Sequence, residues 1–161
     1  MTDSYLLYVL LANGQFLKQE FNMGYYTELK FKAKLKQDTP ENVVNILKRV
    51  INERDLGHDK ALFKSDDVFK PEFDHPFFKC ERWYMLFLST NWDKEMQGGK
   101  FYEKDGRWIL DLHTEFKNYD NEIDHFFEWI KPFIVGRKKK QYVGYWKGES
   151  MNSQCNLYVE R

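Results

Sequence analysis

The chain has 161 residues, of which 42% are hydrophobic and 31% are charged, and its 25 basic and 25 acidic residues cancel. This length suits one domain, residues 1–161, with a core of its own. The charged fraction excludes a membrane protein and the aromatic and hydrophobic content excludes a disordered chain, while the balanced charge argues against general binding of duplex DNA, which needs a basic surface.

Aromatic residues make up 18% of the chain, with 14 Phe, 10 Tyr and 5 Trp. We therefore expect a core filled largely by rings, and partly exposed rings suited to contact with a partner. Cys80 and Cys155 are too few and too far apart for a disulfide scaffold or a thiolate metal site, which indicates reduced thiols in a cytoplasmic protein. The apolar run at residues 5–12 has neither the basic start of a signal peptide nor the length of a membrane span, so we expect no export and no insertion into a membrane.

The first predicted element is a β-hairpin. Two apolar-rich runs flank Asn13-Gly14, and Asn-Gly suits the type I′ turn because both of its central residues need positive φ. A short helix over residues 3–12, ended by Gly14, is the alternative, since Leu and Ala also suit helices.

A strand and a helix follow. In residues 27–35 apolar or small residues alternate with Lys and Glu, which predicts a strand with one buried face. Its other face carries a row of lysines, which we call the lysine row: Lys30, Lys32, Lys34 and Lys36. Thr39 or Asp38 is expected to cap the next helix, with Pro40 at its first position and Asn52 near its end. The buried stripe of this helix consists of Val43, Val44, Leu47, Val50 and Ile51.

Residues 53–76 show no sustained period and form a predicted insertion. Residues 83–90, WYMLFLST, are apolar on both faces, which predicts a covered strand or an edge strand that pairs with a partner. Asp105-Gly106 is a second hairpin signal and leads into a strand over residues 107–117.

A second helix should begin at Asp120, its cap, and end by about Lys131, because Pro132 cannot continue it. Residues 142–146 and 156–159 then predict a final antiparallel pair of strands. The apolar stripe of the second helix consists of Ile123, Phe126, Phe127 and Ile130.

These elements predict an α+β fold with a mostly antiparallel sheet and two helices on one face. Segments 29–51 and 110–134 share one pattern, which suggests a ββαβ tandem repeat over residues 15–90 and 99–160, related to split βαβ and ferredoxin-like folds. Chance similarity between amphipathic segments is the alternative. If the repeat strands are neighbours, the lysine row lies beside Asp111, His113 and Glu115, and their charges balance it.

No motif assigns a reaction, so the candidate residues are those suited to contact with a macromolecule. The lysine row and the basic run after Gly136 suit an acidic partner or a nucleic-acid backbone, and their alternative is a solvated charged surface. Trp92 suits an interface anchor, with inward packing as its alternative. The candidate interface residues are Lys30, Lys32, Lys34, Trp83, Trp92, Arg137, Lys138, Lys139 and Lys140.

Weaker chemical signals are also present. His113 with Asp111 and Glu115 could hold a metal on one strand face, but their spacing matches no metal signature. Cys80 near His75 is a candidate nucleophile and base, although its apolar surroundings predict a buried, inert thiol. We therefore expect no catalytic residue, no cofactor and no metal.

The sequence favours a cytoplasmic, non-enzymatic protein that acts by binding another macromolecule, with protein the preferred partner. The apolar run at residues 83–90 also suits self-association, so a homodimer is a further expectation. The first alternative is a nucleic-acid or polyanion binder that uses residues 30–36 and 137–140. The second is a small ligand-binding protein or hydrolase with a site near the insertion, and its candidate residues are His58, Asp59, Asp74 and His75.

Overall fold

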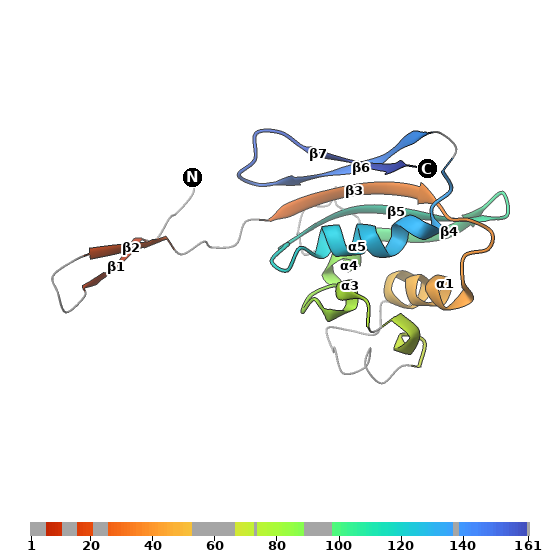
Figure 1. Ribbon diagram of the computed structural model, residues 1–161, viewed down its shortest axis with the longest axis horizontal. Coiled ribbons are helices and arrows are strands. Elements are labelled where there is room, and N and C mark those ends of the chain that lie inside the picture. Colours follow the sequence, from red (N-terminus) through yellow and green to blue (C-terminus); the bar gives the residue numbers. More distant parts are fainter. Residues whose placement is uncertain are drawn as a thin grey trace.

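The structure of the protein, a computed structural model, describes residues 6–10, 16–20, 26–52, 67–72, 74–88, 98–136 and 139–160. A five-stranded antiparallel sheet has the order β4-β5-β3-β6-β7, and the helices cover one of its faces (Figure 1). The predicted α+β fold with a mostly antiparallel sheet is therefore confirmed. The strands of this sheet are β3 (Thr27–Lys34), β4 (Gly98–Lys104), β5 (Arg107–Phe116), β6 (Lys140–Gly148) and β7 (Cys155–Glu160).

Strand β3 lies at the centre of the sheet, between β5 and β6. Lys30 is opposite His113 on one side and opposite Tyr145 on the other. The odd-numbered residues of β3 are buried and Lys30 and Lys32 are exposed, as the alternating sequence predicts. The sequence left open whether residues 27–35 lie beside the strand that begins at Arg107, and the structure pairs the two strands.

Two helices pack on the buried face of the sheet close to their predicted ranges. Helix α1 (Glu41–Leu47) continues into a π-helical turn (Lys48–Asn52), and α5 (Glu122–Ile130) continues into a 3-10 turn (Lys131–Phe133). Their predicted apolar stripes are buried, apart from Phe127, which is half-buried. Helical periodicity therefore identified the packed side of each helix correctly.

The predicted helix caps are wrong. Pro40 is the N-cap of α1, no side chain caps that helix, and the Thr39 hydroxyl donates instead to the carbonyl oxygen of Lys36 at 2.7 Å. At α5 the backbone N–H of Ile123 donates to Oδ1 of Asn118. Asn121 is the N-cap residue of α5, and Oδ2 of Asp120 accepts instead a hydrogen bond from the backbone N–H of Glu81.

The predicted strand over residues 83–90 is also wrong. Residues 81–84 form a turn, and Met85–Leu88 form the short helix α4, which follows α3 (Pro76–Lys79). A short run that is apolar on both faces does not distinguish a covered strand from a buried helical segment, and here the helical turns point several rings into the core. The ββαβ tandem repeat needs a strand at residues 83–90 as the last strand of its first copy, and the structure has a helix there. The repeat therefore stays a hypothesis.

Both predicted hairpins are present. β1 (Leu6–Leu10) and β2 (Phe16–Glu20) pair antiparallel, so the helix alternative for this segment is wrong, while the Asn13-Gly14 turn lies outside the described residues. Between β4 and β5, Asp105 and Gly106 both have positive φ, 54° and 68°. These are the angles that a type I′ turn needs at its two central residues.

The core is a cluster of aromatic rings centred on Phe77. This ring is stacked on Trp129 at 5.6 Å between centroids, and it makes a tilted contact with Phe126, also at 5.6 Å. Phe126 in turn makes an edge contact with Phe31, which joins the ring cluster to β3. The expectation of a core built largely from rings is confirmed. Other rings of the cluster are Phe69, Phe78, Trp83 and Phe87.

A β-bulge in β6 opens the sheet beside β3. The pairing of β6 with β7 shifts between Tyr142 and Gly144, and the pairing of β3 with β6 ends at Phe31 opposite Gly144. Gly144 has φ of 153°, and a Cβ there would overlap the carbonyl oxygen of Lys30. The close approach of the two backbones at this point therefore requires glycine.

Phe77→Ala should lower the free energy of unfolding by about 3 to 5 kcal/mol, because it removes a fully buried ring and leaves a cavity among its neighbours. Urea denaturation measures the change. Tyr119→Ala is the matched control, since its ring is 53% exposed, and it should cost less than about 1 kcal/mol. Equal losses in the two variants would contradict the central position of Phe77.

Gly144→Ala should destabilise the fold by more than about 2 kcal/mol, because the added methyl forces β6 away from β3. Gly106→Ala is the control: Gly106 also has positive φ, but nothing lies within 4 Å of the added methyl. The control should cost only about 1 kcal/mol in the same urea titration. A Gly144 variant as stable as this control would show that the two strands can separate freely.

Candidate interface on the open face of the sheet

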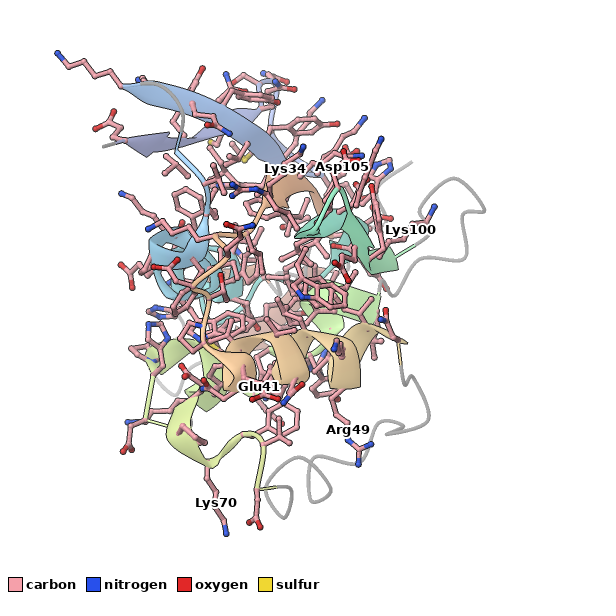
Figure 2. All side chains as sticks on the ribbon, turned by 90° about the vertical axis from the view of Figure 1, so that its right-hand side faces the viewer. Lys34, Glu41, Arg49, Lys70, Lys100 and Asp105 are labelled. Carbon is pink, nitrogen blue, oxygen red and sulfur yellow. The ribbon has the colours of Figure 1, made fainter. Side chains whose placement is uncertain are left out.

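No described helix covers the other face of the sheet, and we call this the open face. The alternation and register of the strands place the side chains that project from it, and Figure 2 shows Lys34 and Lys100 on the side of the sheet away from Glu41 of α1. The open face consists of Glu28, Lys30, Lys32, Lys34, Lys100, Tyr102, Lys104, Arg107, Ile109, Asp111, His113, Glu115, Lys140, Tyr142, Tyr145, Lys147, Asn156, Tyr158 and Glu160.

The open face is basic although the chain is neutral. Its described residues include eight Lys or Arg side chains against four Asp or Glu side chains. The compensating acidic residues therefore lie elsewhere on the molecule. Such an uneven distribution attracts a partner of opposite charge and orients it as it approaches.

Charged and polar side chains link the three central strands across this face. Lys32 of β3 forms an ion pair with Asp111 of β5 at 2.5 Å, and this hydrogen bond raises the pKa of Lys32. Glu28 of β3 accepts from the Tyr145 hydroxyl at 3.0 Å and lies 2.9 Å from Nε2 of His113. Burial and the neighbouring Glu28 carboxylate raise the pKa of Tyr145. The acidic neighbours expected for the lysine row are therefore present, and they neutralise only part of it.

Lys30 and Lys34 make no ion pair within the described part of the chain. Lys30 is exposed and Lys34 is half-buried. An ammonium group that makes no ion pair gains more from an acidic partner than a paired one does, and this gain is larger for Lys34, which is partly desolvated. These two lysines are the strongest charged contacts that the centre of the open face can offer.

Tyrosine rings border the lysines on the open face. The Tyr142 side chain is 50% exposed, and its ring contacts that of Tyr158 at 5.7 Å between centroids. Lys140 lies over the Tyr158 ring at 4.4 Å, and Tyr102 is 36% exposed near the opposite edge of the sheet. Tyrosine combines a large apolar ring with a hydroxyl group, and it is enriched in protein interfaces for that reason.

A cavity of about 320 Å³ lies between Lys36, Lys48 and Trp108, and two further cavities lie beside Val135 at the end of the sheet that Figure 2 faces. The smaller, about 270 Å³, opens beyond the bulge and is lined by Lys32, Lys34 and Gln141 among others. The larger, about 790 Å³, is lined by residues 36–38, 131–132 and 134–136, by Arg107, and by the last residues of β7. Val135 lines both, so the two cavities are neighbours, and we call them together the end groove.

The end groove is lined by residues of the lysine row and lies next to the basic run, whose described residues Lys139 and Lys140 do not line it. Lys34 belongs to the lysine row, and Gln141 directly follows Lys140, the last residue of the basic run. Lys139 and Lys140 are exposed, whereas Arg137 and Lys138 lie outside the described residues. The strand register and the bulge create this arrangement, and neither is visible in the sequence.

The two candidate tryptophans have different outcomes. Trp83 is only 6% exposed, and its ring contacts Phe78 at 4.9 Å, so in this conformation it has almost no surface for a partner. Trp92 lies outside the described residues. Sequence reasoning missed Tyr142, Tyr158 and Arg107 as surface candidates, because the pairing of Tyr142 with Tyr158 that places both tyrosines on one face is not visible in the sequence.

The chemical candidates are held in structural roles. Burial, followed by the nearby Glu122 and Asp120 carboxylates, raises the pKa of the Cys80 thiol to about 11. Nδ1 of His75 accepts a hydrogen bond from the backbone N–H of Phe77 and so caps α3. Among the described residues no three His, Cys, Asp or Glu side chains are grouped as metal ligands, and His58 and Asp59 lie outside those residues.

Searches of protein-family models, of curated proteins and of solved structures found no match to this chain. None of the described helices has the length and apolar character needed to cross a bilayer. A function therefore has to be inferred from the side chains of the chain itself.

Cys80 should not react with a thiol reagent in the folded protein, because at about pH 8 only about one thiol in a thousand with a pKa near 11 is ionised. Titration with Ellman's reagent should detect Cys155, which is half-buried, and should detect both thiols after denaturation. The Cys155→Ser variant is the control and should show almost no reaction while folded. Rapid reaction of that variant would mean that Cys80 is accessible and ionised.

Proposed function

We propose that the protein acts by binding another protein, one with an acidic surface, through the open face of its sheet. The observation that carries this proposal is the basic open face of a neutral chain, where Lys30 and Lys34 make no ion pair with any described residue and are bordered by tyrosines. Complementary charge would speed the encounter, and the tyrosine rings would supply apolar contact once the surfaces meet.

The size of the open face supports this function. Five strands spaced by about 4.8 Å span about 19 Å, and eight residues of β3 extend about 26 Å. Side chains standing on such a face enlarge the contact surface to an area comparable with the roughly 800 Å² that each partner buries in a standard interface.

A protein partner suits this face better than nucleic acid does. Glu28, Asp111, Glu115 and Glu160 lie among the lysines, and their carboxylates repel a continuous phosphate backbone. The hydroxyl of Tyr145 is held by Glu28, which restricts the freedom of that ring to stack on a base. A protein surface can place basic or donor groups opposite these carboxylates, and acidic groups opposite Lys30 and Lys34.

A second copy of the chain is a poor occupant of the open face, because two basic surfaces repel each other. A homodimer formed elsewhere on the chain remains a prediction, and light scattering at micromolar concentration tests it. We place the protein in the cytoplasm, where its two free cysteines would remain reduced.

Lys30→Glu should weaken binding of the partner at least about tenfold, because it places a fourth carboxylate in the centre of the open face, beside Glu28 and Asp111. The partner is first captured from a lysate of the source organism on the immobilised wild-type protein, with nuclease present. It is then purified, and its Kd is measured by calorimetry for the wild type and for each variant.

Lys79→Glu is the matched control, because Lys79 is an exposed lysine on α3, on the helical side of the molecule. It should leave the Kd within about twofold of the wild type. An equal increase of the Kd in both variants would contradict the proposal. So would a partner that the immobilised protein retains from the lysate only when nuclease is left out. The second result would indicate nucleic acid as the partner.

A further inference from the structure

We propose that the end groove binds an acidic peptide segment of the partner, with one carboxylate side chain in its smaller cavity. This inference rests on the proposed function, because it assigns the groove to the same partner. It adds a specific chemistry, an extended chain that carries Asp or Glu together with aliphatic side chains.

The cations of the larger cavity are positioned to meet such a segment. Arg107 and Lys131 make no ion pair within the described residues. Nζ of Lys36 donates to the carbonyl oxygen of Pro132 at 2.6 Å, which fixes a third cation at the wall. A guanidinium group binds a carboxylate through two parallel hydrogen bonds, so Arg107 is the expected anchor.

The acidic residues of the larger cavity neutralise only part of this charge. Asp38 and Glu160 line it, and Oε1 of Glu160 lies 3.9 Å from Nζ of Lys140. The three lysine and arginine side chains therefore face two carboxylates, one of which already has a basic neighbour. The cavity keeps a net attraction for an anion, but the two carboxylates disfavour a dense row of phosphates.

The walls of the groove suit aliphatic side chains and are held in place by the backbone. Val135, which is half-buried and lies between the two cavities, is the accessible aliphatic side chain of the lining, and Ile134 and Val159, 1% and 6% exposed, support it from behind. The backbone N–H of Val135 donates to the carbonyl oxygen of Lys34 at 2.9 Å. A pre-formed wall lowers the entropy that binding costs, and its apolar surface is of no use to a phosphate backbone.

The smaller cavity has the chemistry of a carboxylate site. Its lining includes Lys32, Lys34 and Gln141 and no acidic residue, and Ala33 and Ile109 are its buried apolar part. Lys32 is already paired with Asp111, so Lys34 is the available cation and Gln141 supplies an amide at the rim. A Glu side chain could place its methylene groups on the apolar part and its carboxylate at Lys34.

Fluorescence anisotropy at low salt tests the inference with a labelled decapeptide that alternates Glu and Val. We expect saturable binding to the wild type, and no binding of the matching Lys and Val peptide. Lys34→Glu and Arg107→Glu should each weaken binding at least about tenfold, and Lys79→Glu should change it less than about twofold. Lys34→Gln and Arg107→Gln remove a positive charge without adding a negative one, so their Kd for the peptide should lie between those of the wild type and the Glu variants. Circular dichroism checks that each variant folds.

Absence of peptide binding, or binding that these variants do not weaken, would overturn the inference. Equal affinity for labelled oligothymidylate, weakened by the same variants, would also overturn it by showing a site for polyanions in general. The two proposals fail separately. If Lys30→Glu weakens binding of the partner but the wild type does not bind the peptide, the proposed function stands and the groove inference fails. If the peptide binds but Lys30→Glu does not weaken binding of the partner, the groove inference stands and the proposed function fails.

Discussion

The two-sided pairing of β3 is the constraint on which the rest of the structure depends. Hydrogen bonds to β5 and β6 fix which of its side chains point to each face. Leu29, Phe31 and Ala33 enter the core, where Phe31 meets the ring cluster through Phe126, and the lysines between them are left on the open face. A shift of one residue in this register would bury the lysines and expose the rings, so the apolar core also determines where the basic surface lies.

Much of the fold follows from the sequence where one periodicity holds over a long segment. The alternation in β3 and β5 and the stripes of α1 and α5 each record one buried face, and burial dominates the energetics of such elements. Residues 83–90 have no polar face to set a period, so packing among neighbouring rings decided their conformation. The caps failed because Asp120 and Thr39 can each bond several backbone groups: Asp120 bonds the distant N–H of Glu81, and Thr39 bonds the carbonyl oxygen of Lys36 in the turn before the helix.

The candidate site was less accessible to sequence reasoning than the fold. The lysine row is a local pattern within β3, so it was visible in the sequence. The groove beside it lies where β6 separates from β3, beyond the bulge at Gly144. That bulge is 110 or more residues further along the chain, so no local pattern could reveal the groove. Trp83 shows the opposite problem, since a large ring suits a core and an interface equally well and only its surroundings decide. Local patterns identify side-chain chemistry, but surfaces made by distant strands need the register.

The position of β3 in the chain has a consequence for how the protein is made. His113 and Tyr145, which approach Glu28 from the two neighbouring strands, follow it by 85 and 117 residues. During translation, β3 therefore leaves the ribosome long before either neighbour exists, with its apolar residues exposed. Closing such long loops costs entropy before any pairing is gained, so this topology implies slow folding that is completed only after the C-terminal strands are released.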